Sequence, residues 1–242
     1  MKPDYQETSS RQFSDSQEGS SRLVVDSQEE ASRLLPHYQE ISSRLFAHYP
    51  ELKCALNFRN PYELLVASRL SAQCTDKRVN IVCEELFRRW PTPEALARAN
   101  LSDVESVVRP CGLYRMKSKD IVAMAKMLEQ RGIPDTLEGF LELPGVGRKI
   151  ANLLMGELYD APGVIVADTH CIRLSNRLGL VKNTKDPLKV EMALRKIVPP
   201  QESMRFCHAL VHHGRECCDA RKPRCEECFL QDLCKEYVTK DR

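Results

Sequence analysis

Four cysteines near the C-terminus constrain this chain more than any other feature of its sequence. Cys218, Cys225, Cys228 and Cys234 follow the spacing C-x6-C-x2-C-x5-C. Zinc sites are commonly built from two C-x2–4-C pairs separated by a longer gap, and only the central pair here has that spacing. A compact loop of four cysteines suits a 4Fe–4S cluster, which takes one thiolate per iron. The spacing favours an iron–sulfur cluster, with zinc or unliganded thiols as the alternatives.

The remaining cysteines show no such pattern. Cys217 stands beside the first candidate ligand and could replace it, but Cys218 gives the more compact spacing. No secretory signal is recognisable, so disulfides are disfavoured and a reducing, cytoplasmic location is expected. Free thiols that act as small hydrophobic side chains are expected at Cys54, Cys74, Cys83, Cys111, Cys171, Cys207 and Cys217.

An 11-residue tandem repeat occupies the N-terminal region, as DYQETSSRQFS, DSQEGSSRLVV, DSQEEASRLLP and HYQEISSRLFA. Such a period can mark a right-handed supercoil, but four units with few apolar positions are too little for one. The first units are rich in serine, which favours disorder. We expect residues 1–36 to be a disordered leader, either inert or partner-binding. The fourth unit leads into an apolar helical sequence and marks the start of the folded part.

The rest of the chain reads as helical almost throughout, with proline and glycine between the helices. Only the segment VIVA at 164–167 resembles a strand, and it is too short and isolated to build a sheet. We therefore expect an all-α protein of two lobes. One lobe comprises residues 57–162, and the other combines residues 37–56 with 163–242. No apolar run is long enough to span a membrane.

A glycine hairpin in LPGVGRKIANLL, residues 143–154, is the second strong feature. Gly145 and Gly147 let the backbone approach another molecule closely. The following helix begins near Arg148, so its free N–H groups and positive dipole end form a potential phosphate site. Such a hairpin would bind a nucleic-acid backbone without regard to sequence. A plain connection between two helices is the alternative.

Two charged residues near this hairpin are candidates for catalysis. Lys149 lies in the first helical turn, where the helix dipole opposes a cation and favours the nucleophilic, neutral amine. A solvated lysine is the alternative. Asp168, in VADTHCIRLSNR, precedes another helix, where aspartate is a preferred N-cap. The cap and a carboxylate at the mouth of a cleft are compatible. Thr169 and His170 could orient nearby groups.

These features, taken together and in order, resemble the endonuclease III family of helix-hairpin-helix DNA glycosylases. The resemblance runs from about residue 50 to residue 237 and leaves out the repeat. It rests on four motifs in order: the glycine hairpin, the lysine within it, the aspartate of VADTH and the cysteine spacing. The similar segments are LNFRNPYELLVASRLSAQCTD, CGLYRMKSKDI, LPGVGRKIAN, VADTHCIRLSNR and HGRECCDARKPRCEECFLQDLC. It implies a six-helix barrel domain with the hairpin and a helical domain with a 4Fe–4S cluster.

The resemblance also implies roles for individual residues. Lys149 would attack the sugar C1′ and expel a damaged base, and Asp168 would assist it. For this family the expected damaged bases are oxidised pyrimidines. The resulting Schiff base would permit β-elimination, so that the chain would be both DNA glycosylase and AP lyase. Gln73 would fill the gap left by the flipped nucleotide and Leu113 would wedge against the opposite strand. The basic residues of the cysteine loop would contact DNA: Arg221, Lys222 and Arg224.

Two alternatives remain at this stage. Related adenine-mismatch glycosylases share the hairpin, aspartate and cluster but lack the lysine, so Lys149 argues for the lyase branch. A non-enzymatic DNA-binding iron–sulfur protein would use the hairpin only as a backbone clamp. Beyond residue 36 the chain has 32 basic and 27 acidic residues, which permits DNA binding without arguing strongly for it. A monomer acting on damaged double-stranded DNA in a bacterial-type cytoplasm, at the nucleoid, is expected.

Overall fold

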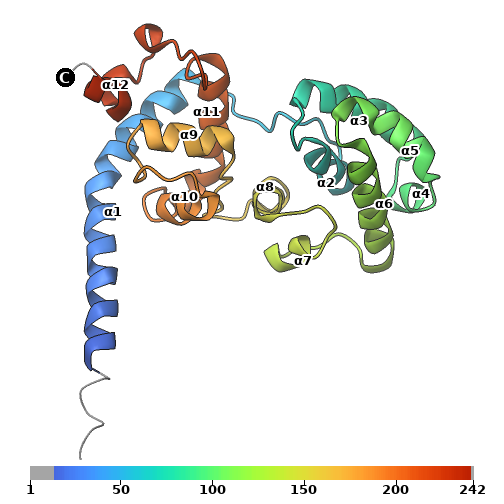
Figure 1. Ribbon diagram of the computed structural model, residues 1–242, viewed down its shortest axis with the longest axis horizontal. Coiled ribbons are helices and arrows are strands. Elements are labelled where there is room, and N and C mark those ends of the chain that lie inside the picture. Colours follow the sequence, from blue (N-terminus) through green and yellow to red (C-terminus); the bar gives the residue numbers. More distant parts are fainter. Residues whose placement is uncertain (1–13, 241–242) are drawn as a thin grey trace, which may run out of the picture.

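The computed structural model describes residues 14–240, which form helices and connecting loops arranged as two lobes (Figure 1). The hairpin lobe is formed by consecutive helices that follow one another between residues 61 and 159. They are α2 (Pro61–Leu70), α3 (Asp76–Arg89), α4 (Pro93–Ala97), α5 (Leu101–Val108), η1 (Arg109–Cys111), α6 (Tyr114–Arg131), α7 (Leu137–Leu141) and α8 (Arg148–Tyr159).

The cysteine lobe joins the N-terminal helix to the C-terminal third of the chain (Figure 1). Helix α1 packs against α11 in this lobe. Its elements are α1 (Ser14–His48), α9 (Thr169–Arg177), α10 (Pro187–Leu194), η2 (Pro200–Glu202), α11 (Ser203–Glu216), η3 (Cys225–Glu227), η4 (Gln231–Leu233) and α12 (Lys235–Lys240). Among the described residues, no helix has the length and apolar character needed to cross a membrane.

Each lobe has its own hydrophobic core. One core is built from residues between Leu56 and Leu154, and the other combines residues of α1 with residues from Ile165 to Leu230. Helix α8 contributes to both, because Leu154 is buried in the first core while Leu153 packs against the second. In Figure 1 this helix accordingly lies between the two lobes. A residue on α8 is therefore placed where the lobes meet.

Local sequence explains where several helices begin. Proline follows the N-cap in α2, α4 and α10, where its missing N–H costs no hydrogen bond. Asn60, Thr92 and Asp186 supply the cap, each accepting a backbone N–H of the first turn with its side-chain oxygen. The apolar segment 164–167 is buried without strand pairing and connects α8 to α9.

The N-terminal repeat differs from the sequence-based expectation of disorder. From Ser14 the repeat continues into the same helix as the fourth unit, and residues 1–13 lie outside the described part. An 11-residue period is close to three helical turns, so equivalent positions of successive units fall on one face. In the fourth unit that face is fully buried at Tyr38, Ile41 and Leu45. In the third unit, Ala31 and Leu34 continue it against the same core.

Candidate functional site: a lysine–aspartate pocket between the lobes

The glycine hairpin connects α7 to α8. Gly145 has a φ of +74°, in the left-handed region that favours glycine. A Cβ at this position would also collide with the guanidinium of Arg69 and lie 2.9 Å from Asp120. Gly147 is the N-cap of α8, has no side chain to cap the helix, and faces open space. The first N–H groups of α8 therefore have no capping side chain as a partner. The phosphate site expected here from the sequence stays a prediction.

Lys149 and Asp168 line the same pocket of about 90 Å³ between the lobes. Lys149 is the second residue of α8 and its side chain is exposed. Asp168 is the N-cap of α9, and its Oδ1 accepts the backbone N–H of Cys171 at 2.7 Å. Because the cap uses Oδ1, the other carboxylate oxygen is available to the pocket. The cap and the cleft-facing carboxylate therefore coexist.

Further residues of this pocket carry no recognisable signal in the sequence. Arg215 on α11 forms an ion pair with Asp76 at the start of α3, and both line the pocket. His208 also lines it and lies 2.6 Å from the carboxylate of Glu157 on α8. Each of these pairs joins α11 to the hairpin lobe. Charged residues at helix ends are common, so only the fold reveals that these meet.

His170, which the sequence suggested could orient nearby groups, does not line the pocket of Lys149 and Asp168. Its Nδ1 lies 3.2 Å from the guanidinium of Arg173, which also donates to the backbone oxygens of Gly214 and Cys218. Burial lowers the pKa of His170. The neutral imidazole therefore belongs to the packing between α9 and α11.

Gln73 and Leu113 lie at two exposed turns of the hairpin lobe. Gln73 follows α2 with a φ of +53°, and Leu113 precedes α6 with a φ of +49°. Leu113 is 49 % exposed, so its side chain is not packed in the core. Non-glycine residues rarely adopt this conformation, and they do so mainly where the surroundings impose it. Both side chains project from backbones held in an unusual geometry.

The cysteine loop follows α11 and surrounds a cavity. All four candidate ligands line this cavity together with Cys217, and none of the five forms a disulfide. Arg177 donates to Cys218 Sγ at 3.2 Å, and the Cys234 thiol lies 3.4 Å from the backbone oxygen of Arg177. Several sulfur donors that converge on one cavity fit an iron–sulfur cluster, which needs one thiolate per iron.

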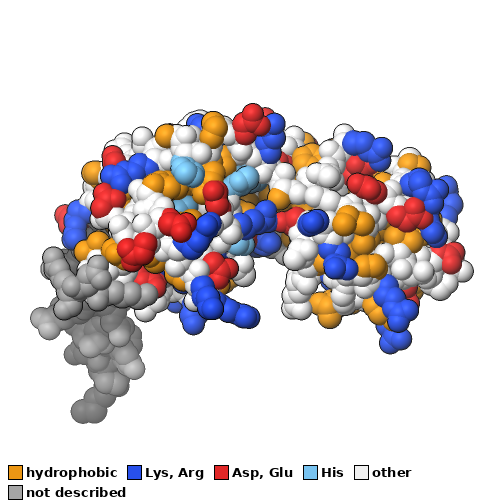
Figure 2. Space-filling model, turned by 90° about the horizontal axis from the view of Figure 1, so that it is seen from above, with side chains coloured by type: hydrophobic (Ala, Val, Ile, Leu, Met, Phe, Trp, Pro, Cys, Tyr) orange, Lys and Arg blue, Asp and Glu red, His pale blue; other side chains and the backbone are white. Residues whose placement is uncertain are grey.

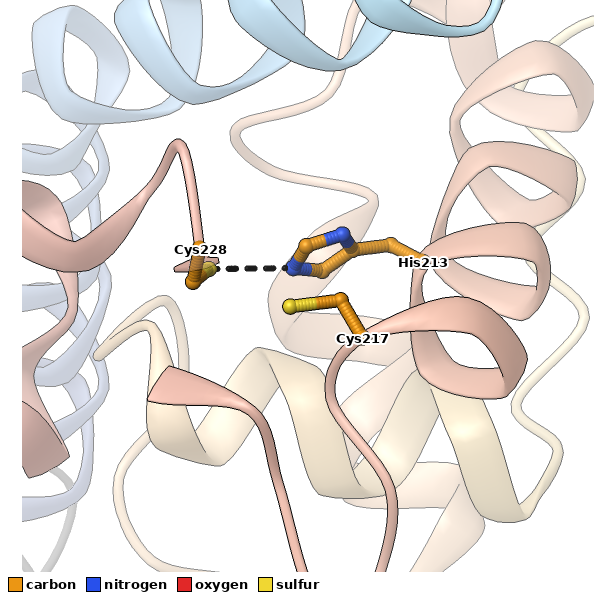
Figure 3. Close-up of side chains that lie close together, drawn as sticks. All are labelled: His213, Cys217 and Cys228. Atoms are coloured by element: carbon orange, nitrogen blue, oxygen red, sulfur yellow. Dashed lines mark hydrogen bonds between the residues drawn. The ribbon is translucent and has the colours of Figure 1, made fainter. Parts of the chain in front are cut away.

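Three side chains near this cavity form a closer cluster that includes only one of the four cysteines expected to bind the iron–sulfur cluster. His213 Nε2, Cys217 Sγ and Cys228 Sγ all lie within 4.8 Å of one another (Figure 3). His213 Nε2 is hydrogen-bonded to Cys228 Sγ at 3.4 Å, as Figure 3 shows. Burial lowers the pKa of His213 to about 4, so the imidazole is neutral near pH 7. The thiol of Cys217 thus lies at the same cavity as the four expected cysteine ligands.

The basic residues of the loop are exposed beside this cavity. The carboxylate of Asp219 accepts the backbone N–H groups of Arg221 and Lys222 at 2.8 and 3.1 Å, which fixes the loop and leaves both side chains outward. Arg224 forms an ion pair with Glu227 at 3.2 Å.

Figure 2 shows Lys and Arg side chains gathered where the two lobes meet. An anionic polymer would meet cations at this junction.

Comparisons with known proteins agree with this arrangement. Residues 66–200 match the family model of the HhH-GPD superfamily base excision DNA repair proteins. Residues 218–234 match the model of the iron–sulfur binding domain of endonuclease III. The matched range begins at Cys218 and ends at Cys234. The 4Fe–4S cofactor expected from the spacing is thereby confirmed as the family's cofactor.

Relatives and solved structures give the same family. Endonuclease III of Synechocystis sp. is 42 % identical over 75 % of this chain and 84 % of its own length. Endonuclease III of Escherichia coli K12 is 39 % identical over 76 % and 88 %. A non-covalent endonuclease III–DNA complex superposes with a TM-score of 0.82 at 36 % identity, covering 86 % of this chain and 98 % of that one. The chain therefore belongs to the endonuclease III family, within the HhH-GPD superfamily of base excision DNA repair proteins.

Proposed function

We propose that this chain releases oxidised pyrimidines from damaged DNA and then cleaves 3′ to the abasic site by β-elimination, as a bifunctional DNA glycosylase and AP lyase. The observation that carries the proposal is the pocket shared by Lys149 and Asp168 at the N-terminus of α8. The lysine is the residue that distinguishes a lyase from a glycosylase that uses only water. A trapped endonuclease III–DNA covalent intermediate is known for a relative that is 38 % identical to this chain.

In this proposal the neutral amine of Lys149 forms a bond to the sugar C1′ of the flipped nucleotide. The glycosidic bond breaks, and its electron pair leaves with the base, which takes up a proton. The C1′–O4′ bond then breaks, its electron pair stays on O4′, which takes up a proton from the attached amine, and a protonated Schiff base remains between Lys149 and C1′. Loss of a C2′ proton breaks the C3′–O bond and releases the 3′ phosphate. Water hydrolyses the Schiff base and returns the free lysine.

Asp168 assists this chemistry through its free carboxylate oxygen. Because Oδ1 is held by the N–H of Cys171 at 2.7 Å, the carboxylate has a fixed orientation at the pocket. A fixed negative charge stabilises the positive charge that develops on the sugar as the base departs. It can also accept the proton that the Lys149 ammonium must lose before it attacks.

DNA would be held at several separate surfaces. The open N–H groups at Gly145 and Gly147 suit a phosphate of the damaged strand. Gln73 and Leu113 suit insertion into the space left by the flipped nucleotide. Arg221, Lys222 and Arg224 would contact the backbone near the cysteine loop. In this proposal a single chain supplies every DNA contact and acts as a monomer.

Cys218, Cys225, Cys228 and Cys234 would hold the 4Fe–4S cluster. When bound, this group cross-links the loop after α11 by coordination. With four thiolates the cluster carries net negative charge, so it is not itself a phosphate site. Its contribution to DNA binding would come from the cationic side chains that the loop presents.

Cleavage of defined duplexes by the purified holoprotein tests this proposal. Duplexes with thymine glycol and with a pre-formed abasic site should both be cut, and borohydride should trap a covalent protein–DNA adduct. Lys149→Ala should form no adduct and cut neither duplex, while binding to undamaged DNA stays close to wild type. Binding without cleavage by the wild-type protein would instead favour a non-enzymatic DNA-binding protein. Full adduct formation by Lys149→Ala would assign the nucleophile to another amine.

A further inference from the structure

Lys117 on α6 is completely buried, which is unusual for a lysine. Its ammonium donates to the backbone oxygens of Leu70 and Cys111, each at 2.8 Å. Burial lowers the pKa of this group. Burying an ammonium costs free energy unless its N–H groups are hydrogen-bonded, and the two carbonyl oxygens offset that cost. The reaction proposed above gives Lys117 no role.

The two carbonyls that Lys117 contacts belong to the two turns that carry Gln73 and Leu113. Leu70 ends α2, three residues before Gln73, and Cys111 lies in η1, two residues before Leu113. Both turns contain a non-glycine residue with positive φ, at +53° and +49°. Such conformations persist only where the surrounding structure imposes them. One ammonium thus ties the two turns to each other, although they are far apart in sequence.

The same face of α6 also supports the hairpin. Asp120, one turn after Lys117, accepts two hydrogen bonds from the guanidinium of Arg69, at 2.8 and 2.6 Å. Arg69 is the residue before Leu70, and its side chain is 7 % exposed. Gly145 packs directly on this ion pair, since any Cβ there would meet both side chains. Helix α6 therefore contacts all three segments of the hairpin lobe that are proposed to face DNA.

We infer that Lys117 is a positioning residue for nucleotide flipping, which holds the Gln73 and Leu113 turns at a fixed separation so that both side chains enter the duplex together. The inference rests on the proposed function, because it assumes that these two side chains insert into DNA. Insertion offsets the loss of stacking and pairing only if both side chains arrive at the correct depth. The ammonium supplies that constraint without touching the DNA itself.

The test uses two substrates that differ only in the cost of flipping. One is a duplex with thymine glycol opposite adenine, and the other has the same lesion opposite a missing base, where there is no partner base to hold apart. Lys117→Met keeps the length of the side chain and removes its donors. It should slow release from the paired lesion by at least about tenfold, because small displacements of positioned groups are costly. Release of the unpaired lesion should stay close to wild type.

Ser118→Ala is the matched control, because Ser118 is the next residue on α6, is equally buried, and has a hydroxyl without a hydrogen-bond partner. It should leave both substrates unaffected. A second variant, Lys117→Gln, is neutral but still donates hydrogen bonds, and should lose less on the paired lesion than Lys117→Met. In a Gln73→Ala background, Lys117→Met should have a smaller effect than in the wild type, because the two residues act through one step.

The outcomes separate this inference from the proposed function. If the wild-type protein releases neither lesion, the proposed function fails whatever the variants do. If the wild type releases both and Lys117→Met slows both equally, Lys117 only maintains the fold and the inference is overturned. If Lys117→Met does not fold, the comparison rests on Lys117→Gln, whose equal loss on both substrates would likewise overturn it.

Discussion

Asp76 at the start of α3 and Arg215 in the last turn of α11 form an ion pair that joins the two lobes at the pocket lined by Lys149 and Asp168. Their side chains are 23 % and 45 % exposed, so solvent screens the pair. Exposed pairs of this kind contribute about 0–1 kcal/mol to folding. Its position on the pocket wall suggests a larger effect on the arrangement of the lobes around a bound nucleotide than on stability.

Arg215→Gln should therefore separate activity from stability. We expect kcat/KM for lesion release to fall several-fold, while thermal unfolding changes little. Arg98→Gln is a suitable control, since Arg98 forms an ion pair with Glu129 within the hairpin lobe and away from the pocket. A fall in melting temperature without a fall in kcat/KM would assign the Arg215 pair to folding alone.

Asp168→Asn should distinguish charge from helix capping. Asparagine is as good an N-cap as aspartate, so α9 should remain stable while the negative charge is lost. We expect base release to slow by about a hundredfold or more. Borohydride trapping on a pre-formed abasic site should persist in part, because the base is already gone.

Asp168→Ala supplies the comparison for this prediction. It removes the charge and the cap together, and should in addition cost about 1 kcal/mol of stability, measured by chemical denaturation. Base release at the wild-type rate by Asp168→Asn would show that the carboxylate acts only as a helix cap.

Cys228→Ser should impair cluster retention. Cys228 lines the cavity and is hydrogen-bonded to His213, so its loss removes one ligand and one contact to α11. Iron and acid-labile sulfide per chain should fall together, with loss of the brown colour that thiolate-to-iron charge transfer produces. Zinc in place of iron in wild-type samples prepared without oxygen would contradict the assignment.

Cys217→Ser is the matched control, because Cys217 lies at the same cavity but outside the compact spacing. We expect its iron content to equal that of the wild type. A loss as large as that of Cys228→Ser would make Cys217 a ligand in place of Cys218.

The N-terminal helix should have a dispensable part and an essential part. Removal of residues 1–28 should leave cleavage nearly unchanged, since the buried face of α1 begins with Ala31 and Leu34 in the described side chains. Tyr38→Ala should destabilise the protein by about 3–5 kcal/mol, as for other buried aromatic residues. Tyr38 is fully buried, contacts Phe206 edge to face, and donates to Glu202 at 2.8 Å.

Leu35→Ala on the same helix is the control for Tyr38→Ala, because Leu35 is 37 % exposed. It should change the free energy of unfolding by less than about 0.5 kcal/mol. A large loss of activity on removing residues 1–28 would show that the repeat takes part in catalysis or DNA binding.

The sequence by itself determined most helices and the iron–sulfur character of the cysteine loop. Asn60-Pro61, Thr92-Pro93 and Asp186-Pro187 mark helix starts because capping and proline geometry act within a few residues. The spacing of the four cysteines likewise indicated an iron–sulfur cluster, because all four expected ligands lie close together in one short loop. The extent of α1 was not recognisable, because the serine-rich repeats have too few apolar residues to signal a buried face.

Only the tertiary structure decided which distant residues act together. Lys149 and Asp168 are each ambiguous in sequence, and their common pocket arises because α8 and α9 begin where the lobes meet. Nothing in the sequence marks Lys117 as buried, because its partners are backbone carbonyls that carry no sequence signal, one of them 47 residues away. Local propensity fixes the elements, whereas the meeting of side chains depends on packing between segments that the chain brings together only on folding.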